Sequence, residues 1–358
     1  MHVLFRRTSA FVSVLALALV FAGAAAAAQS DFTVTPLVSD NGVPGTATDG
    51  NLVNAWGLAS SSTSPWWVAD NGKSVSTLYN GAGAKLPLTV AVSEDPTGVV
   101  FNTPGVADPT AFDVVAGSPA AFLFDGEGGT ITAWNGSQGT TAKLEVDQGA
   151  QDGAVFKGLA IAQTSAGPRL YATDFHNRRV DVYDKNWQPV DQPFQFFDPT
   201  IPHSYGPFGI QAIGDRIFVT YAKTQPGSDD EAHGQGLGFV DSFDAATGIL
   251  DGRVAMHGQL NAPWGLAMAP QGFGDLGGDL LVGNFGDGRI HAYRPILGGL
   301  AFVPAGRLDV SHGSPLQIDG LWALEFGNGA NAGPTGTLFF TAGPNDENDG
   351  LFGTITPS

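Results

Sequence analysis

One short signature recurs along the chain at intervals that fit the blades of a β-propeller. A small residue, or a Pro with Trp or Phe, is followed by a glycine and then by a short apolar strand. The glycines are Gly57, Gly98, Gly158, Gly209 and Gly265, separated by 41, 60, 51 and 56 residues. Residues 320–324 are a degenerate sixth copy. A period of this length is typical of a four-stranded blade with variable loops.

Three further strands follow each copy of the signature. The second and third strands are expected at 66–69 and 75–79, 121–124 and 130–134, 170–173 and 179–183, 217–221 and 237–243, 280–282 and 289–293, and 338–341 and 351–355. The turns between them carry pairs such as Asn71-Gly72 and Asp287-Gly288, which tolerate the positive φ angles of tight hairpins. Fourth strands are expected at 85–92, 141–146, 189–196, 252–257 and 302–310.

The two ends of the chain complement each other. The sixth copy reaches Ser358 before a fourth strand, whereas residues 31–38 form a strand that precedes the first copy. We therefore predict an all-β, six-bladed propeller with four antiparallel strands in each blade. The N-terminal strand (31–38) completes the last blade, which closes the ring and covers an edge that would otherwise promote aggregation.

The first residues have the composition of a targeting segment. Arg6 and Arg7 precede an apolar run at 11–22, and alanines at 24–28 offer a cleavage site before Gln29. We expect a signal peptide at 1–28 and a single propeller domain at 29–358, exported to the periplasm or the extracellular space. No later stretch is apolar for long enough to cross a bilayer, so we expect no membrane insertion. The chain has no cysteine, so its stability must come from its core.

The charge excludes one class of partner. The formal net charge is −18, and a surface of this sign repels phosphate backbones. We therefore expect no nucleic-acid binding. A monomer is the expected state.

Several segments resemble known propellers. The Pro-x-Gly-Leu-Ala signature, followed by residues 69–71 (ADN) or 173–177 (TDFHN) and by 180–183 (VDVY), looks like the NHL-type propeller superfamily. The whole expected mature chain resembles more closely a family of uncharacterised exported bacterial propeller proteins. That match rests on residues 51–57 (NLVNAWG), 124–131 (FDGEGGTI), 171–176 (YATDFH) and 262–267 (APWGLA). The resemblance implies the fold and export, but no activity.

Propeller geometry places the links into the innermost strands and the turns between second and third strands on one face, here called the top face, where ligands usually gather. Polar and aromatic residues are abundant in these segments. The ligand-binding candidates are Asn54, Trp56, Asp70, Asn71, Asp125, Asp174, His176, Asn177, His203, Tyr205, Lys223, Asn261, Trp264, Asn284, Asp319 and Trp322.

Three interpretations of this set stay open. The first is a ligand-binding or interaction module for a small molecule, a glycan or a protein. The second is a metal-dependent hydrolase or lyase of the lactonase type, with a divalent cation, calcium or magnesium, on the axis. Its candidate ligands are Asp70, Asp174, His176, His203, Asn284 and Asp319. The third is structural, because Asp and Asn cap propeller turns and tolerate left-handed conformations. The long polar turn at 223–236 is either a lid over this face or a passive loop.

Overall fold

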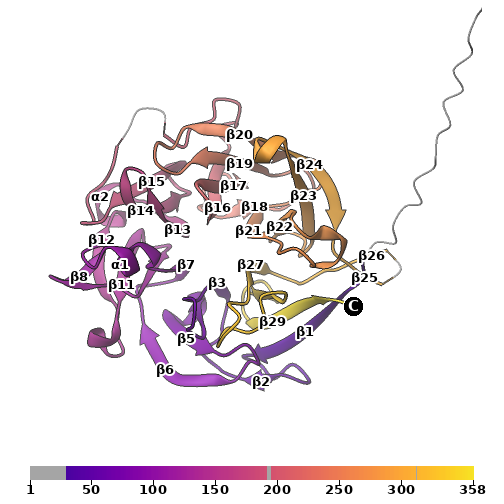
Figure 1. Cartoon of the computed structure of the whole chain (residues 1–358), viewed down its shortest axis with the longest axis horizontal. Helices are drawn as coiled ribbons and strands as arrows, with labels where there is room; N and C mark the ends of the chain where they lie inside the picture. Colours follow the sequence, from indigo (N-terminus) through magenta and orange to yellow (C-terminus); the bar gives the residue numbers. More distant parts are fainter. Residues whose placement is uncertain (1–29, 192–194, 312) are drawn as a thin grey trace, which may run out of the picture.

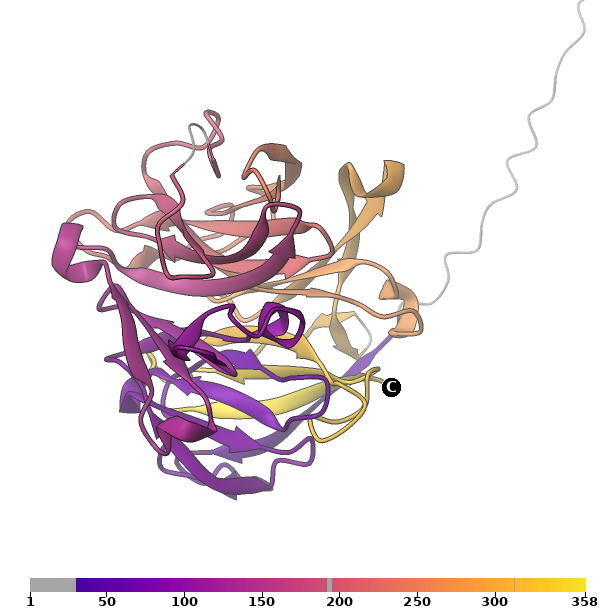
Figure 2. The same ribbon diagram turned by 60° about the vertical axis from the view of Figure 1, so that its left-hand side comes forward.

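The computed structural model describes residues 30–191, 195–311 and 313–358, and these residues form a six-bladed β-propeller. The blades surround a central axis, with the chain running round the ring from indigo to yellow (Figure 1). The turned view shows the blades stacked side by side, each with its strands running across the thickness of the ring (Figure 2). The all-β, six-bladed prediction is confirmed. No helix in the described ranges is long and apolar enough to cross a membrane.

Each blade is one sheet that begins at the axis, and its strands are antiparallel except for the parallel pair of β1 and β2 at the outer edge of the sixth blade. The first blade contains β3 (Ala55–Ala59), β4 (Trp66–Asp70), β5 (Val75–Tyr79) and β6 (Lys85–Ala91). The second contains β7 (Pro96–Phe101), β10 (Phe122–Gly126), β11 (Thr130–Trp134) and β12 (Lys143–Asp147). The third contains β13 (Phe156–Thr164), β14 (Gly167–Asp174) and β15 (Arg179–Asp184).

The second half of the ring repeats the pattern. The fourth blade contains β16 (Tyr205–Ile213), β17 (Arg216–Thr224), β19 (Phe239–Asp244) and β20 (Leu250–Met256), with the short β18 (Glu231–Ala232) paired to β17. The fifth contains β21 (Pro263–Met268), β22 (Leu280–Asn284), β23 (Ile290–Ile296) and β24 (Ala301–Arg307). The sixth contains β27 (Leu321–Phe326), β28 (Leu338–Ala342), β29 (Leu351–Pro357), β1 (Phe32–Ser39) and β2 (Ala47–Thr48).

The remaining elements are short connections between strands. They are the helices α1 (Thr103–Ala107) and α2 (Gly149–Asp152), the 3-10 turns Asn71–Lys73, Gly136–Gln138, Gly274–Leu276 and Leu297–Gly299, and the strand pairs β8 (Asp113–Val115) with β9 (Ser118–Pro119) and β25 (Asp309–Ser311) with β26 (Ser314–Pro315).

The ring closes through the N-terminal strand, as the sequence predicts. β1 pairs antiparallel with β29 from Phe32↔Pro357 to Ser39↔Leu351, with one irregularity between Pro36 and Val38. Phe32 is 1% exposed and packs on Phe273 of the fifth blade, with ring centroids 5.1 Å apart. The closing strand therefore joins the last two blades. The expected signal peptide lies outside the described residues.

The third blade departs from the prediction at its outer edge. Of the fourth strand expected at 189–196, residues 192–194 lie outside the described residues. The described part shows one isolated bridge between Tyr183 and Pro189, followed by a bond from Val190 N to Val182 O (2.8 Å). Proline has no N–H to donate to a ladder, so pairing that begins at Pro189 is weakened from its first residue.

Glycines allow five of the six innermost strands to approach the axis closely, and Ala323 takes this position in the sixth. Each signature glycine faces the backbone of the next blade. A Cβ built on Gly57 would lie 2.6 Å from Thr97 O, one on Gly98 2.4 Å from Leu159 N, and one on Gly209 2.1 Å from Trp264 O. No side chain fits at such distances, so the repeated glycine follows from close packing of backbones around the axis.

Candidate functional site

The residue before each signature glycine, or before Ala323 in the sixth copy, points to the axis and helps to fill the channel. The six positions carry Trp56, Thr97, Lys157, Phe208, Trp264 and Trp322. Trp56 stacks on Trp322 with centroids 3.5 Å apart, and Trp264 meets Trp56 edge-on at 6.1 Å. Phe208 packs against the Trp56 ring at 6.4 Å. We call these six residues the axial ring. Its aromatic members form a nearly closed apolar floor below the top face.

Lys157 is the one ionisable member of the axial ring. It is 2% exposed, and its Nζ lies 5.4 Å from the centre of the Trp56 ring and 6.0 Å from that of Phe175. Its ammonium forms an ion pair with Glu127, which comes from the turn between β10 and β11. A buried ammonium requires such a partner, because burial without one costs several kcal/mol.

A chain of hydrogen bonds extends from this ion pair over the first and sixth blades. Asn71 Nδ2 donates to Glu127 Oε2 (3.1 Å), and Asn54 Nδ2 donates to Asn71 Oδ1 (3.1 Å) and to Glu347 Oε2 (2.7 Å). Trp322 Nε1 donates to Asn54 Oδ1 (3.0 Å). Four blades thus contribute to one polar network directly above the aromatic floor.

The fourth blade adds an acid and an imidazole. β18 folds the long 223–236 turn back onto β17, with Lys223↔Ala232 and Thr224↔Glu231 as partners. Glu231 is 6% exposed and contacts His233 Nε2 through Oε1 at 3.1 Å. We call the group Asn54, Asn71, Glu127, Lys157, Glu231, His233 and Glu347 the axial cluster.

Negative charge dominates the axial cluster. Burial, with added repulsion from Glu231 and Glu127, raises the pKa of Glu347. The bond to Glu231 raises the pKa of His233, which favours the imidazolium. Burial opposes the charge on Lys157, but attraction to Glu127 and Glu231 outweighs it and raises the pKa of the ammonium. Three carboxyl groups therefore face one lysine and one histidine.

Five of the predicted site residues meet at the axis. Asn54 and Asn71 belong to the axial cluster, and Trp56, Trp264 and Trp322 belong to the axial ring beneath it. The tryptophans are 2%, 9% and 0% exposed, so they pack on one another rather than presenting open surface to the solvent. The role of these five residues in ligand binding stays a prediction.

Six other predicted residues make structural bonds inside their own blades or turns. Asp125 accepts bonds from Thr97 Oγ1 (3.0 Å) and Gly98 N (2.6 Å), which ties a turn to an innermost strand. The same kind of local bond is made by Asp70 to Thr77, by Asp174 to Asn177, by Asn261 to Gly234, and by Asn284 to Asn261. These bonds fit the structural interpretation of the turn residues.

The last five predicted residues lie away from the axial cluster or at its margin. His176 is about half exposed and pairs with Asp229 (2.7 Å), and Asp319 is exposed and accepts a bond from Asn345 N (3.0 Å). His203 is exposed and Tyr205 buried beside an outer cavity, and Lys223 is part of β17.

A divalent cation does not fit these residues well. Five of the six candidate ligands, Asp70, Asp174, His176, Asn284 and Asp319, are held in separate turns by the bonds just described. The sixth, His203, is exposed beside an outer cavity. Within the described ranges, no three His, Cys, Asp or Glu residues are placed to hold a metal ion together. At the axis, Lys157 already places a positive charge against Glu127.

The ligand-binding candidates selected from the sequence do not include Glu231, His233 or Glu347. They also leave out Lys157 and Glu127, although the links and turns of the top face carry both residues. One signal could have found Lys157. It occupies the position before the glycine that carries Trp or Phe in four other copies, and a lysine at an aromatic position of a repeat is unusual. The glutamates lie in turns whose inward direction only the folded ring defines.

The channel has a second end, opposite the top face. A cavity of about 340 Å³ there is lined by the final residues of innermost strands from five blades, among them Glu325 and Gln211. Gln211 Nε2 donates to Glu325 Oε1 (2.7 Å) across the channel. Burial raises the pKa of Glu325 to about 7.

Two viral proteins are similar to the chain over most of its length, whereas no family model matches it. "Uncharacterized protein R648" of Acanthamoeba polyphaga mimivirus is 32% identical over 341 residues, covering 92% of this chain and 81% of the viral protein. "Uncharacterized protein L690" of the same virus is 30% identical over 344 residues, covering 92% and 86%. These relatives are viral, so they give no support to a bacterial family.

Solved structures share the fold at low identity. A Bacteroides thetaiotaomicron protein of unknown function has a TM-score of 0.56 at 13% identity and covers 91% of this chain and 76% of its own. The calcium-binding protein regucalcin from Agrobacterium tumefaciens has a TM-score of 0.50 at 12% identity, covering 86% and 91%. A gluconolactonase from Xanthomonas campestris has a TM-score of 0.49 at 14% identity, covering 86% and 87%. At these identities the similarity is one of fold alone.

Proposed function

The chain belongs to the family of the mimivirus proteins R648 and L690, and we propose that its top face binds a small organic cation at the axial cluster. One observation carries the proposal. A nearly fully buried lysine stands among three glutamates directly above an aromatic floor, and the axial cluster has one more acidic side chain than basic ones.

Forming the axial cluster costs more free energy than the propeller fold requires. Five of the six axial-ring positions are filled without a charge, and a fifth aromatic residue in place of Lys157 would fill the remaining position without burying an ammonium. Asn345, Asp346 and Glu347 also adopt φ angles of 58°, 51° and 64°, and left-handed backbone at non-glycine residues carries strain. Backbone strain of this kind is concentrated at functional sites, where a side chain must be held in one position. This turn places Glu347 in the axial cluster.

The charges indicate the chemistry of the ligand. An amine or guanidinium group would supply positive charge to Glu347 and Glu231, and Lys157 and His233 leave part of the negative charge of the cluster uncompensated. Aromatic faces also favour cations, since the centre of each ring is electron-rich. A small cation with a flat or apolar body would therefore match both layers of the site.

A ligand-binding module at this face extends the first interpretation of the sequence. We also keep export and a monomeric state as parts of the proposal, so that the ligand would be met outside the cytoplasm. The metal-dependent hydrolase or lyase has weaker support, because the axial residues pair a carboxylate with a lysine instead of gathering ligands for a metal.

Titration calorimetry with spermidine tests the proposal. Glu347→Gln removes one charge and keeps an oxygen for Asn54 Nδ2, so the network should stay intact. We expect spermidine to bind the unchanged protein and to bind Glu347→Gln roughly tenfold more weakly or worse, because a charge-assisted bond is lost. Glu145→Gln, on β12 beside Lys143, is the matched control and should bind spermidine normally.

Two parallel titrations separate the alternatives. Glucose tests a neutral glycan, and Ca²⁺ alone tests the metal site. Absence of spermidine binding, or equal binding by both variants, would contradict the proposal. Saturable Ca²⁺ binding at one ion per chain that Glu347→Gln abolishes would favour the hydrolase or lyase instead.

A further inference from the structure

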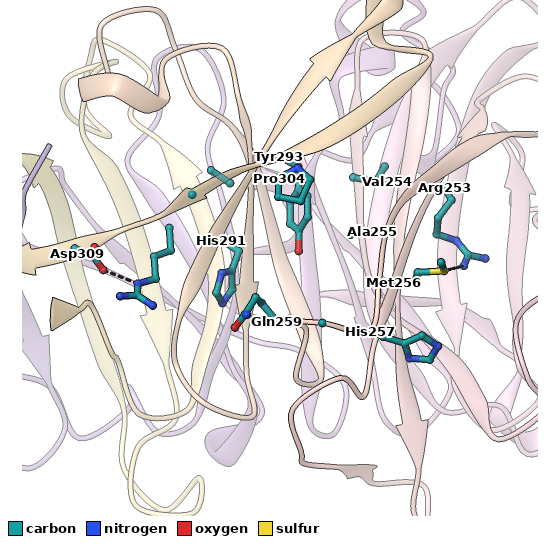
Figure 3. Close-up of a pocket in the computed structure, with 14 residues that line it drawn as sticks. Arg253, Val254, Ala255, Met256, His257, Gln259, His291, Tyr293, Pro304 and Asp309 are labelled. Atoms are coloured by element: carbon teal, nitrogen blue, oxygen red, sulfur yellow. Dashed lines mark hydrogen bonds and ion pairs between the residues drawn. The ribbon is translucent and has the colours of Figure 1, made fainter. Parts of the chain in front are cut away.

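A second pocket lies outside the axial cluster, between the fourth and fifth blades. It has a volume of about 650 Å³. One wall is the end of β20 with residues 257–259, and the other is β23 and β24 with Asp309 (Figure 3). The volume is in the range of small-molecule sites.

Small residues leave this space unfilled. Ala255 and Gly258 lie on the fourth-blade side, and Ala292 and Gly306 lie on the fifth-blade side. The junction between the first two blades is filled by comparison, since the Trp67 ring stacks on Phe122 at 4.3 Å and meets Trp134 at 4.7 Å. The pocket is therefore a local property of one blade junction and not of the fold.

Two polar groups in the pocket have no hydrogen-bond partner among the described residues. His291 is 5% exposed, and its buried Nε2 is unpaired. Tyr293 is 7% exposed, and its hydroxyl points into the pocket between the two walls (Figure 3). Buried polar groups in proteins are nearly always paired, and leaving one unpaired costs about 1–3 kcal/mol. His291 Nε2 is such a group, and the Tyr293 hydroxyl faces the same pocket, so a molecule bound there would find two hydrogen-bonding groups that the described residues leave unused.

The charged residues at the margins of the pocket are already neutralised. Arg253 pairs with Asp241 and Asp198, and Arg307 pairs with Asp309 at 2.7 Å. Burial lowers the pKa of His291 and raises that of Tyr293 to about 12, so both groups are neutral near pH 7. The pocket thus offers no free charge to an ionic ligand.

Apart from His257 and Gln259, the rest of the lining is apolar. Met256 is 61% exposed at the mouth, and its flexible side chain can adapt to different shapes. We propose that this pocket binds a neutral, largely apolar small molecule that carries a hydroxyl group, which pairs with the Tyr293 hydroxyl and the His291 imidazole. This site is separate from the axial cluster and does not depend on it.

Equilibrium dialysis with 2-naphthol tests the proposal, and naphthalene serves as the probe without a hydroxyl. Tyr293→Phe removes only the unpaired hydroxyl and should weaken 2-naphthol binding about fivefold, the value of one neutral hydrogen bond. His291→Phe removes the unpaired nitrogen with a ring of similar size and should weaken it similarly. Naphthalene should bind these two variants and the unchanged protein alike.

Tyr221→Phe is the matched control. Tyr221 also has a buried hydroxyl without a partner among the described residues, but it lines a different cavity. The Tyr221→Phe variant should bind 2-naphthol as the unchanged protein does. Thermal melting checks that every variant is folded. The proposal is overturned if 2-naphthol does not bind the unchanged protein, or if Tyr293→Phe and His291→Phe bind it as tightly as the unchanged protein does.

Discussion

At the scale of the residue, two neighbouring positions of the repeat have different roles at the axis. The signature glycine permits the backbones to approach, and the residue before it fills the space that they enclose. Where that residue is Trp or Phe it adds to the floor, and where it is Lys157 it recruits Glu127 and the asparagines above. A lysine at this one position of the repeat thus introduces a buried charge, and Glu127 and the asparagines form the polar network that stabilises it.

Replacement of a signature glycine should destabilise the ring. In Gly209→Ala, the new methyl group would lie 2.1 Å from Trp264 O, so the fourth and fifth blades must move apart. We expect the free energy of unfolding to fall by about 1–3 kcal/mol, the usual cost of overpacking. Urea denaturation measures this loss. Gly336→Ala has no atom within 4 Å of the new methyl group and should change stability little; an equal loss in both variants would refute the explanation.

At the scale of the element, the strand that closes the ring also ties two blades together. β1 completes the sixth blade through its pairing with β29, and the residues around its start reach the fifth blade. Ser30 N donates to Asp275 Oδ1 (3.1 Å), and Phe32 lies in the same core cluster as Phe273 and Leu276. Closure therefore depends on side chains as well as on the ladder.

The anchoring of β1 can be tested at one side chain. Phe32→Ala removes a buried ring and leaves a cavity between two blades, so the free energy of unfolding should fall by about 3–5 kcal/mol. Thr33→Ala, at an exposed neighbour on the same strand, should cost far less. Amide hydrogen exchange in β29 should speed up in Phe32→Ala before exchange in the first blade does. Unchanged protection of β29 would mean that the ladder alone holds the closing strand.

At the scale of the whole molecule, the axis has two ends with different chemistry. The top face holds the axial cluster, and the opposite end holds a single carboxyl group, Glu325, bonded to Gln211 across the channel. Glu325 has no ion-pair partner among the described residues, and its environment favours the protonated form. Neither property is visible in any one blade.

The protonation of Glu325 links stability to pH. Its pKa is about 7 in the folded protein, against an ordinary value of 4.5, so the folded state binds the proton more tightly. The contribution of this group to stability is therefore fully present below pH 4.5 and is lost as the pH rises through 7. The loss should be about 2 kcal/mol, less than the full shift implies because the side chain keeps some contact with solvent. The Glu325→Gln variant should not lose this stability as the pH rises, because its amide does not titrate.

Urea denaturation at several pH values between 4 and 8 measures this contribution. The difference between the unchanged protein and Glu325→Gln should grow across that range, in favour of the variant at the upper end. Parallel curves for the two proteins would show that Glu325 titrates normally.

The sequence by itself determined the architecture, because the repeat is a local pattern. Each blade encodes its own glycine, hairpins and alternating strands, and the missing fourth strand at one end matches the extra strand at the other. The same local logic failed at Pro189, where a strand that looks regular in composition lacks the donor that pairing requires.

The site was decided by the tertiary structure. Asn54, Trp56 and Asn71 could be expected near the axis, but Asp70 and Asp125, which are neighbours of site residues, turn into their own blades. Glu127, Glu231 and Glu347 come from three turns far apart in sequence and meet because closure of the ring points those turns inward. Sequence patterns report which residues share a strand or turn; the distances between turns of different blades exist only after the ring has closed.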